Sequence, residues 1–189
     1  MVGSEQDGNL KKAIVTIKVE KSWVSNNNLG IGDIGFFRFD EANQEWGGFN
    51  TVFKEEDVEW FKNEGNSSIK GTARFKSIDG EVRFGKEFRV ELNPYCAYTK
   101  ERLNHIYKND DSGYVYIESG IPKFVPDPEG YHQTRKVMCN ENGEFEFKNL
   151  PEGEYYVIAF MLWDKTGGGI MSHVNLSNNE TKIIEMTNF

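Results

Sequence analysis

The chain has 189 residues, a length that fits one ordinary domain or one domain with an extension. It carries 30 acidic and 22 basic residues, a net charge of −8 with neutral histidines, and 14% of its residues are aromatic. This aromatic content excludes a disordered chain. The acidic balance disfavours nucleic acid and anionic membranes, whose phosphates bind Lys and Arg. No apolar run reaches the length of about 18 residues that a transmembrane helix needs, so we expect none.

Short stretches in which apolar and polar residues alternate recur along the chain, with turn residues between them. In chain order they cover residues 13–20, 34–39, 69–75, 81–84, 87–92, 114–117, 136–139, 144–147, 154–163, 170–176 and 182–186. A period of two predicts β-strands. Repeated strands with turn punctuation are typical of an all-β sandwich or barrel rather than an α/β fold.

Two short segments, 55–63 and 98–107, place apolar residues three or four apart and are predicted to be helical. Thr99 is the predicted N-cap of the second helix. The three glycines at 167–169 predict a loop between two of the last strands.

The domain organisation that we predict has three parts. Residues 1–12 form a flexible segment, residues 13–66 form an N-terminal β region, and residues 67–189 form a β-sandwich. The boundary lies in the polar turn at 63–68, whose Asn, Gly and Ser residues separate the two β portions.

The first residues, 1–9, are polar and lack a charged region followed by an apolar one, so we predict no secretory signal in the sequence as given. Two interpretations stay open. The chain is a cytoplasmic protein with a frayed start, or it is a mature exported chain, such as a lipid-anchored envelope protein that begins with a small polar tether.

Cys96 and Cys139 are the only cysteines. Their even number permits one disulfide in an exported protein, and two buried free thiols are the alternative. They cannot form a zinc site by themselves, because no second cysteine or histidine stands at ligand spacing beside either of them.

Several motifs match a functional pattern only in spacing. Residues 30–35 match the dinucleotide-binding glycine pattern but lead into a strand rather than a helix, and residues 80–87 have the spacing of a P-loop but end in Glu instead of Ser or Thr. His105, His132 and His173 stand in no zinc-protease motif. We therefore predict no catalytic set, no metal and no cofactor.

None of these motifs accounts for the high content of aromatic residues. Trp163, Tyr131 or Trp60 on an exposed face could stack on sugar rings or anchor a protein partner, whereas the alternative is that these rings fill the core. Tyr131, His132 and Trp163 are the binding residues that we predict.

Residues 140–157 read Asn-Glu-Asn-Gly-Glu-Phe-Glu-Phe-Lys-Asn-Leu-Pro-Glu-Gly-Glu-Tyr-Tyr-Val. Asn142-Gly143 predicts a tight turn, and the two phenylalanines that follow fall on one face of a strand. This pattern resembles the signature of the carboxypeptidase-regulatory-like, or transthyretin-like, β-sandwich domains. The resemblance covers about residues 67–189 and implies an antiparallel Greek-key sandwich, here extended by the N-terminal β region and one or two short helices.

Residues 71–75, 88–94 and 98–101 resemble, more loosely, uncharacterised bacterial envelope lipoproteins that carry this domain. The resemblance implies a scaffold without an active site, because the chain has no zinc-peptidase ligands and ends in Met-Thr-Asn-Phe rather than in the Tyr-Arg-Gly-Ser of the transthyretin-like hydrolases. We predict a non-catalytic binding or structural module of the bacterial cell envelope or periplasm, with a protein or glycan partner.

Two alternative functions stay open. One is a hydrolase whose loop-built site lies near His132 and Asp127, in the Pro- and Gly-bearing segment 119–135. The other is a homo-oligomeric assembly block, because exposed edge strands can pair between copies.

Overall fold

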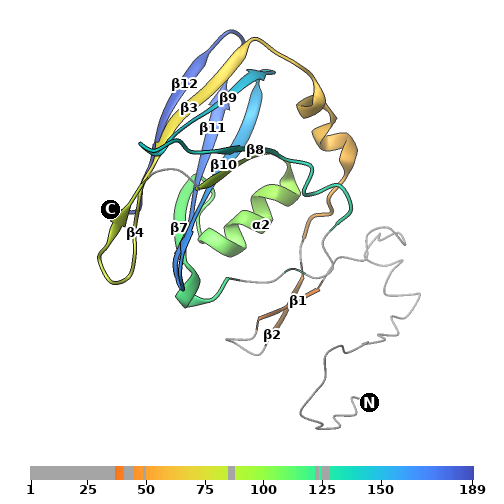
Figure 1. The fold of residues 1–189 in the computed structure, drawn as a ribbon. Coiled ribbons are helices and arrows are strands. Elements are labelled where there is room, and N and C mark those ends of the chain that lie inside the picture. Colours follow the sequence, from red (N-terminus) through yellow and green to blue (C-terminus); the bar gives the residue numbers. More distant parts are fainter. Residues whose placement is uncertain (1–36, 41–44, 49, 85–87, 122–123, 125–127) are drawn as a thin grey trace, which may run out of the picture. The chain divides into compact units, whose positions relative to one another are not determined.

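The computed structural model describes residues 37–40, 45–48, 50–84, 88–121, 124 and 128–189 (Figure 1). Its larger sheet has five strands in the spatial order β7 (Ser112–Tyr116), β11 (Thr166–Leu176), β10 (Gly153–Trp163), β6 (Arg89–Pro94) and β8 (Arg135–Met138). All neighbouring pairs in this sheet are antiparallel. The predicted all-β fold is confirmed.

A second sheet has three strands in the order β12 (Thr181–Met186), β3 (Ser67–Ala73) and β9 (Glu144–Leu150). The β3–β9 pair is antiparallel, but β12 runs parallel to β3, with Thr181 opposite Ser68. The prediction of antiparallel pairing throughout is therefore wrong for this pair. The reason is that β12 does not fold back on β11 within one sheet but crosses to the other sheet.

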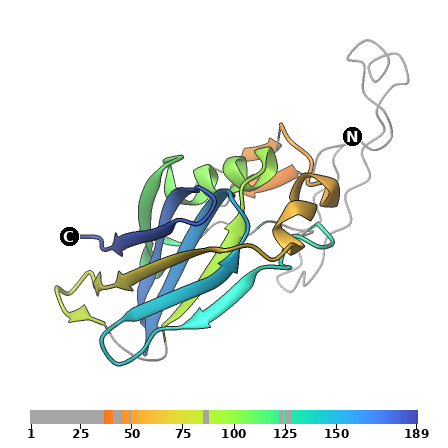
Figure 2. The same cartoon turned by 90° about the horizontal axis from the view of Figure 1, so that it is seen from above.

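The two sheets face one another across the main core. Alternate residues of β10, from Tyr155 to Met161, are completely buried in the same apolar cluster as Ile69 of β3 and Phe145 of β9. The residues between them point to the opposite side of the larger sheet. There Tyr156 packs in a separate cluster with Leu103 and Tyr107 of the helix α2 (Ala97–Tyr107). Figure 2 shows the consequence, since this helix and the smaller sheet lie on opposite sides of the larger one.

The described helices are η2 (Glu55–Lys62), α2 (Ala97–Tyr107) and η3 (Ile117–Ser119). The first is a 3₁₀ helix with Val58 and Phe61 buried, as their three-residue spacing predicts, and both predicted helical segments are confirmed. The predicted N-cap is wrong. Cys96 caps α2, and its sulfur accepts a hydrogen bond from the backbone N–H of Thr99 at 3.4 Å.

The three glycines at 167–169 lie inside β11, opposite residues 160–162 of β10, so the predicted loop is wrong. A Cβ atom on Gly168 would lie 2.5 Å from Cζ of Phe75 and against the carbonyl oxygen of Val115. Glycine is needed here because β7 and the buried ring both approach the backbone of β11, not because the chain turns.

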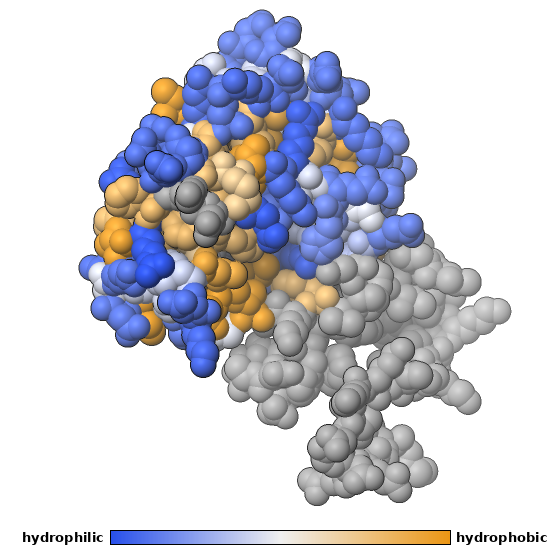
Figure 3. All heavy atoms as spheres, in the orientation of Figure 1, coloured by the Kyte–Doolittle hydropathy of each residue, from blue (hydrophilic) through white to orange (hydrophobic). Residues whose placement is uncertain are grey.

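Two short hairpins complete the described elements, β1 (Phe37–Asp40) with β2 (Glu45–Gly48) and β4 (Phe75–Lys76) with β5 (Val82–Arg83). The predicted strand at 13–20 lies outside the described residues. Contacts group residues 35–189 into one compact unit, and the predicted boundary after residue 66 stays a prediction. Figure 3 shows hydrophilic residues over the upper part of this unit and apolar residues lower on the left, in the region of the β4–β5 hairpin.

Candidate functional site

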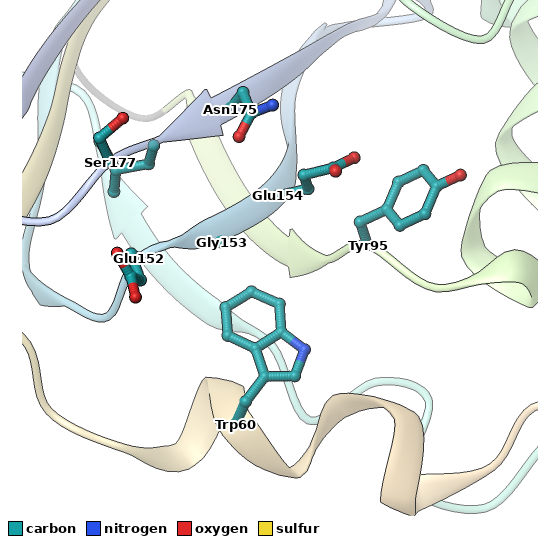
Figure 4. Close-up of a pocket in the computed structure, with 8 residues that line it drawn as sticks. Trp60, Tyr95, Glu152, Gly153, Glu154, Asn175 and Ser177 are labelled. Atoms are coloured by element: carbon teal, nitrogen blue, oxygen red, sulfur yellow. The ribbon is translucent and has the colours of Figure 1, made fainter.

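A groove of about 500 Å³ opens where β10 begins and β11 ends (Figure 4). We call it the β10 groove. It is open to solvent on one side, and its lining combines an indole ring and a phenol ring with carboxylates, a carboxamide and a hydroxyl. The lining residues are Trp60, Tyr95, Glu152, Gly153, Glu154, Asn175, Leu176 and Ser177.

Trp60 reaches the groove from η2, which the buried Phe61 anchors in the core. Its half-buried ring meets the rings of Phe61 and Tyr155 edge to face, with centroids 6.2 and 5.2 Å apart. Gly153 permits this position. Its φ is +155°, and a Cβ atom there would lie 2.5 Å from Cη2 of Trp60. The ring therefore lies directly against the backbone at the start of β10.

The turn before β10 is closed by a side chain of the core. The Tyr155 hydroxyl donates a hydrogen bond to the carbonyl oxygen of Pro151 at 2.6 Å. Burial raises the pKa of Tyr155 well above its usual value, so the hydroxyl stays a donor at neutral pH. This turn places the exposed Glu152 at the edge of the groove.

Tyr95 and Glu154, which line the groove opposite Trp60, belong to a cluster of rings around one histidine. Tyr95 stacks on Tyr156 with centroids 5.8 Å apart, and His173 lies 5.5 Å from the Tyr95 ring. Nε2 of His173 is 3.2 Å from a carboxylate oxygen of Glu154, and its Nδ1 is 3.8 Å from a carboxylate oxygen of Asp111. The ring pair therefore holds the imidazole, and the imidazole holds Glu154 at the groove.

The described lining offers hydrogen-bonding groups around an aromatic ring. Asn175 and Ser177 are exposed, and together with Glu152 and Glu154 they can pair with a ligand's hydroxyl groups. Among these described residues no basic side chain lines the groove. The arrangement suits a neutral or cationic ligand that has an apolar face and many hydroxyls.

The residues predicted from the sequence lie elsewhere. Trp163 and Tyr131 are each only 9% exposed, so of the two alternatives that the sequence left open for these rings, burial in the core is the one observed. Trp163 packs in the main core, and its indole N–H donates to Glu81 at 3.2 Å. His132 is exposed, and it lines a second cavity with Tyr131. Of the named aromatic candidates, Trp60 is the one that lines the β10 groove.

Cys96 and Cys139 are both free and buried, so the disulfide that the sequence permits is not formed. They belong to different apolar clusters. Burial raises the pKa of the Cys139 thiol to about 11, which makes it a poor nucleophile at neutral pH.

The hydrolase alternative, with its site near His132 and Asp127, stays a prediction. Asp127 lies outside the described residues, and His132 is exposed. His173 lies beside Glu154 at the β10 groove, and His105 lies 3.9 Å from Glu101.

Within the described part of the chain, no three His, Cys, Asp or Glu side chains group as metal ligands. The longest described helix, α2, has 11 residues, and none in the described part is long and apolar enough to cross a bilayer.

Sequence reasoning missed Tyr95, Glu154 and Asn175 because the groove joins segments that are distant in the chain. One local signal was present. The glycine at 153 follows a Leu-Pro-Glu turn. Glycine at such a position allows a positive φ, which residue 153 has, and it lets another group approach the backbone closely.

Comparisons with known proteins bear on the fold. No family model matches the chain, and no curated protein matches it. The chain is similar to a crystal structure from Pseudomonas aeruginosa whose protein is named as a putative carbohydrate binding protein. The TM-score is 0.60 at 22% identity, and the match covers 73% of this chain and 99% of the other. At this identity the likeness shows a shared fold.

Proposed function

We propose that the chain is a non-catalytic binding module that recognises a glycan in the β10 groove, on a transthyretin-like β-sandwich. The observation that carries the proposal is the half-buried Trp60 ring beside Glu152, Glu154 and Asn175 in an open groove. Sugar rings have one apolar face and a periphery of hydroxyls, which these groups complement. The shared fold with a protein named as a putative carbohydrate binding protein supports the same conclusion.

The charge of the groove narrows the glycan class. Glu152 and Glu154 line it, and the described lining includes no Lys or Arg. A uronic or sialic acid would bring a third carboxylate into this field, which electrostatic repulsion disfavours. The proposed ligands are therefore neutral sugars or amino sugars.

The test begins with a glycan array and continues with calorimetric titration of the sugars that bind. Trp60→Ala should lower the affinity by about tenfold or more, because it removes the aromatic surface. Asn175→Ala should lower it by a few fold without changing the fold, since that side chain is exposed. Tyr114→Ala is the matched control, because Tyr114 is 47% exposed on β7 and does not line the groove.

Three results would contradict the proposal. The first is an array without any bound glycan, and the second is an affinity that neither Trp60→Ala nor Asn175→Ala changes. The third is the release of shorter saccharides from a bound glycan, abolished by His173→Gln, which would make the chain a hydrolase. Light scattering of the same samples tests the assembly alternative, since a fixed oligomer favours an assembly block.

The cellular location is part of the proposal. The looser resemblance of residues 71–75, 88–94 and 98–101 to bacterial envelope lipoproteins supports an envelope or periplasmic location, with a lipid anchor as one route of attachment. Cell fractionation of the native producer tests it, and recovery in the cytosolic fraction alone would contradict it.

A further inference from the structure

A second cavity, of about 380 Å³, lies between α2 and the outer face of the larger sheet. We call it the α2 cavity. It shares no lining residue with the β10 groove. Most of its described wall is apolar, and the side chains that form this wall include Leu103, Ile106, Phe124, Ile158 and Phe160.

Two polar residues of β6 form part of the wall of this cavity. Val90 and Leu92 are buried in the main core, so the alternation of the strand turns Glu91 and Asn93 to the side that α2 covers. Both are buried there, with 8% of Glu91 and 4% of Asn93 exposed. A polar side chain in such a place needs a partner, because burial removes its water.

The charged groups around the cavity have partners. Glu91 lies 3.0 Å from Arg89 and 3.5 Å from Lys136. The guanidinium of Arg102 lies over the rings of Phe124 and Tyr131, at 4.6 and 4.3 Å from their centroids. These charges are therefore compensated within the protein.

Asn93 is different. Its side-chain nitrogen is buried and has no hydrogen-bond partner among the described residues. An unpaired buried amide costs about 1–3 kcal/mol, and native proteins hold few of them. Asn93 is one of the residues that line the cavity, so a rotation of its carboxamide toward the cavity would let an acceptor there satisfy the nitrogen.

We propose that the α2 cavity binds a small ligand that has an apolar ring or branched chain and one uncharged hydrogen-bond-accepting oxygen, which the Asn93 amide meets. This inference goes beyond glycan binding and concerns a separate site. The volume corresponds to about a dozen waters, which suits a ligand of roughly ten heavy atoms. The charges of Glu91 and Arg102 already have partners within the protein, so a charged ligand would lose its water without gaining a counter-charge, and the apolar wall would leave most hydroxyls of a sugar unpaired.

Acetophenone and ethylbenzene test the proposal, because they have nearly the same shape and only the first has a carbonyl oxygen. Nitrogen–proton NMR spectra of the full chain are recorded during titration with each probe, at equal concentrations. Acetophenone should shift the side-chain NH₂ signals of Asn93 and bind about fivefold more tightly than ethylbenzene, which corresponds to one net hydrogen bond.

Asn93→Leu gives the second measurement. It keeps an apolar group of similar size in the wall and should remove the preference for acetophenone while ethylbenzene still binds. Asn175→Ala in the β10 groove is the control variant and should leave both affinities unchanged. The wild-type NH₂ signals test the proposal independently, should Asn93→Leu fail to fold.

Each outcome of these titrations either supports or contradicts the proposed ligand site. If neither probe shifts the signals of residues around α2, the cavity holds only water and the proposal is wrong. Equal binding of both probes would overturn the role of Asn93. Glucose titrated in the same way distinguishes the two sites, since shifts at the β10 groove without shifts at α2 support glycan binding alone.

Discussion

Gly153→Ala tests the geometry on which the β10 groove depends. The substitution places a methyl group 2.5 Å from Cη2 of Trp60, about 1 Å closer than ordinary contact allows. The ring cannot retreat freely, because it packs edge to face against Phe61 and Tyr155. The φ of +155° adds backbone strain for any residue with a Cβ atom.

The expected destabilisation follows from these two costs. Strain at a glycine-favoured φ costs about 1–3 kcal/mol, and overpacking costs about 1–3 kcal/mol. Together they destabilise the chain by about 2–6 kcal/mol. At about 2–4 °C per kcal/mol for a chain of this size, the melting temperature should fall by roughly 4–24 °C. Glycan affinity should fall as well, since the ring is displaced from the groove.

Two control variants separate the backbone strain from the clash with the Trp60 ring. Gly120 has a φ of +77° with nothing within 4 Å of a built Cβ atom, so Gly120→Ala reports backbone strain alone. Combining Gly153→Ala with Trp60→Ala removes the clash, so the double variant should lose about 1–3 kcal/mol less than the sum of the single variants. Thermal unfolding followed by circular dichroism measures all four chains. If the two losses simply add, the ring does not lie against Gly153 and the reasoning is refuted.

Two further predictions concern a hydrogen-bonded carboxylate, Glu101, and the two buried thiols. Burial alone would raise the pKa of Glu101, but its carboxylate accepts four hydrogen bonds from the backbone N–H and side-chain groups of Asn50 and Thr51, which lower the pKa overall. Glu101→Gln should therefore destabilise the chain by about 1–2 kcal/mol at neutral pH. This difference should shrink as the pH falls below the ordinary glutamate pKa, in urea titrations at several pH values, and a constant difference would contradict it. The buried thiols of Cys96 and Cys139 should react slowly with iodoacetamide in the folded chain. After unfolding without reductant, both should react completely, which mass spectrometry detects. Two cysteines that stay unreactive in the unfolded chain would reveal a disulfide.

The strands and helices could be predicted because their signals are local. The alternation over residues 154–163 places Tyr155 and Val157 in the core, and β10 has those bounds to within one residue. The three-residue spacing in 55–63 likewise marked the buried face of η2. In each case neighbouring residues alone decide which side chains are buried.

The errors concern contacts between distant segments. Glycines at 167–169 usually mark a loop, and only contacts with distant segments explain them inside a strand: Gly168 meets Phe75 and β7, and Gly169 meets the hydroxyl of Tyr107. The parallel β3–β12 pair joins residues more than a hundred positions apart, and no local pattern specifies its direction. The β10 groove has the same property, since it joins η2, the end of β6 and the ends of β10 and β11.

The α2 cavity shows why alternation alone misleads about exposure. Val90, Glu91, Leu92 and Asn93 alternate as in a strand with one buried and one solvated face. The structure buries both faces, because the chain turns after β6 into α2, which lies back over the polar side. A solvated Asn93 would hydrogen-bond water, whereas the side-chain nitrogen of the covered one has no partner among the described residues. The helix that completes the fold thus converts an ordinary outward-facing carboxamide into a buried donor, which makes this cavity specific for a ligand with an acceptor oxygen.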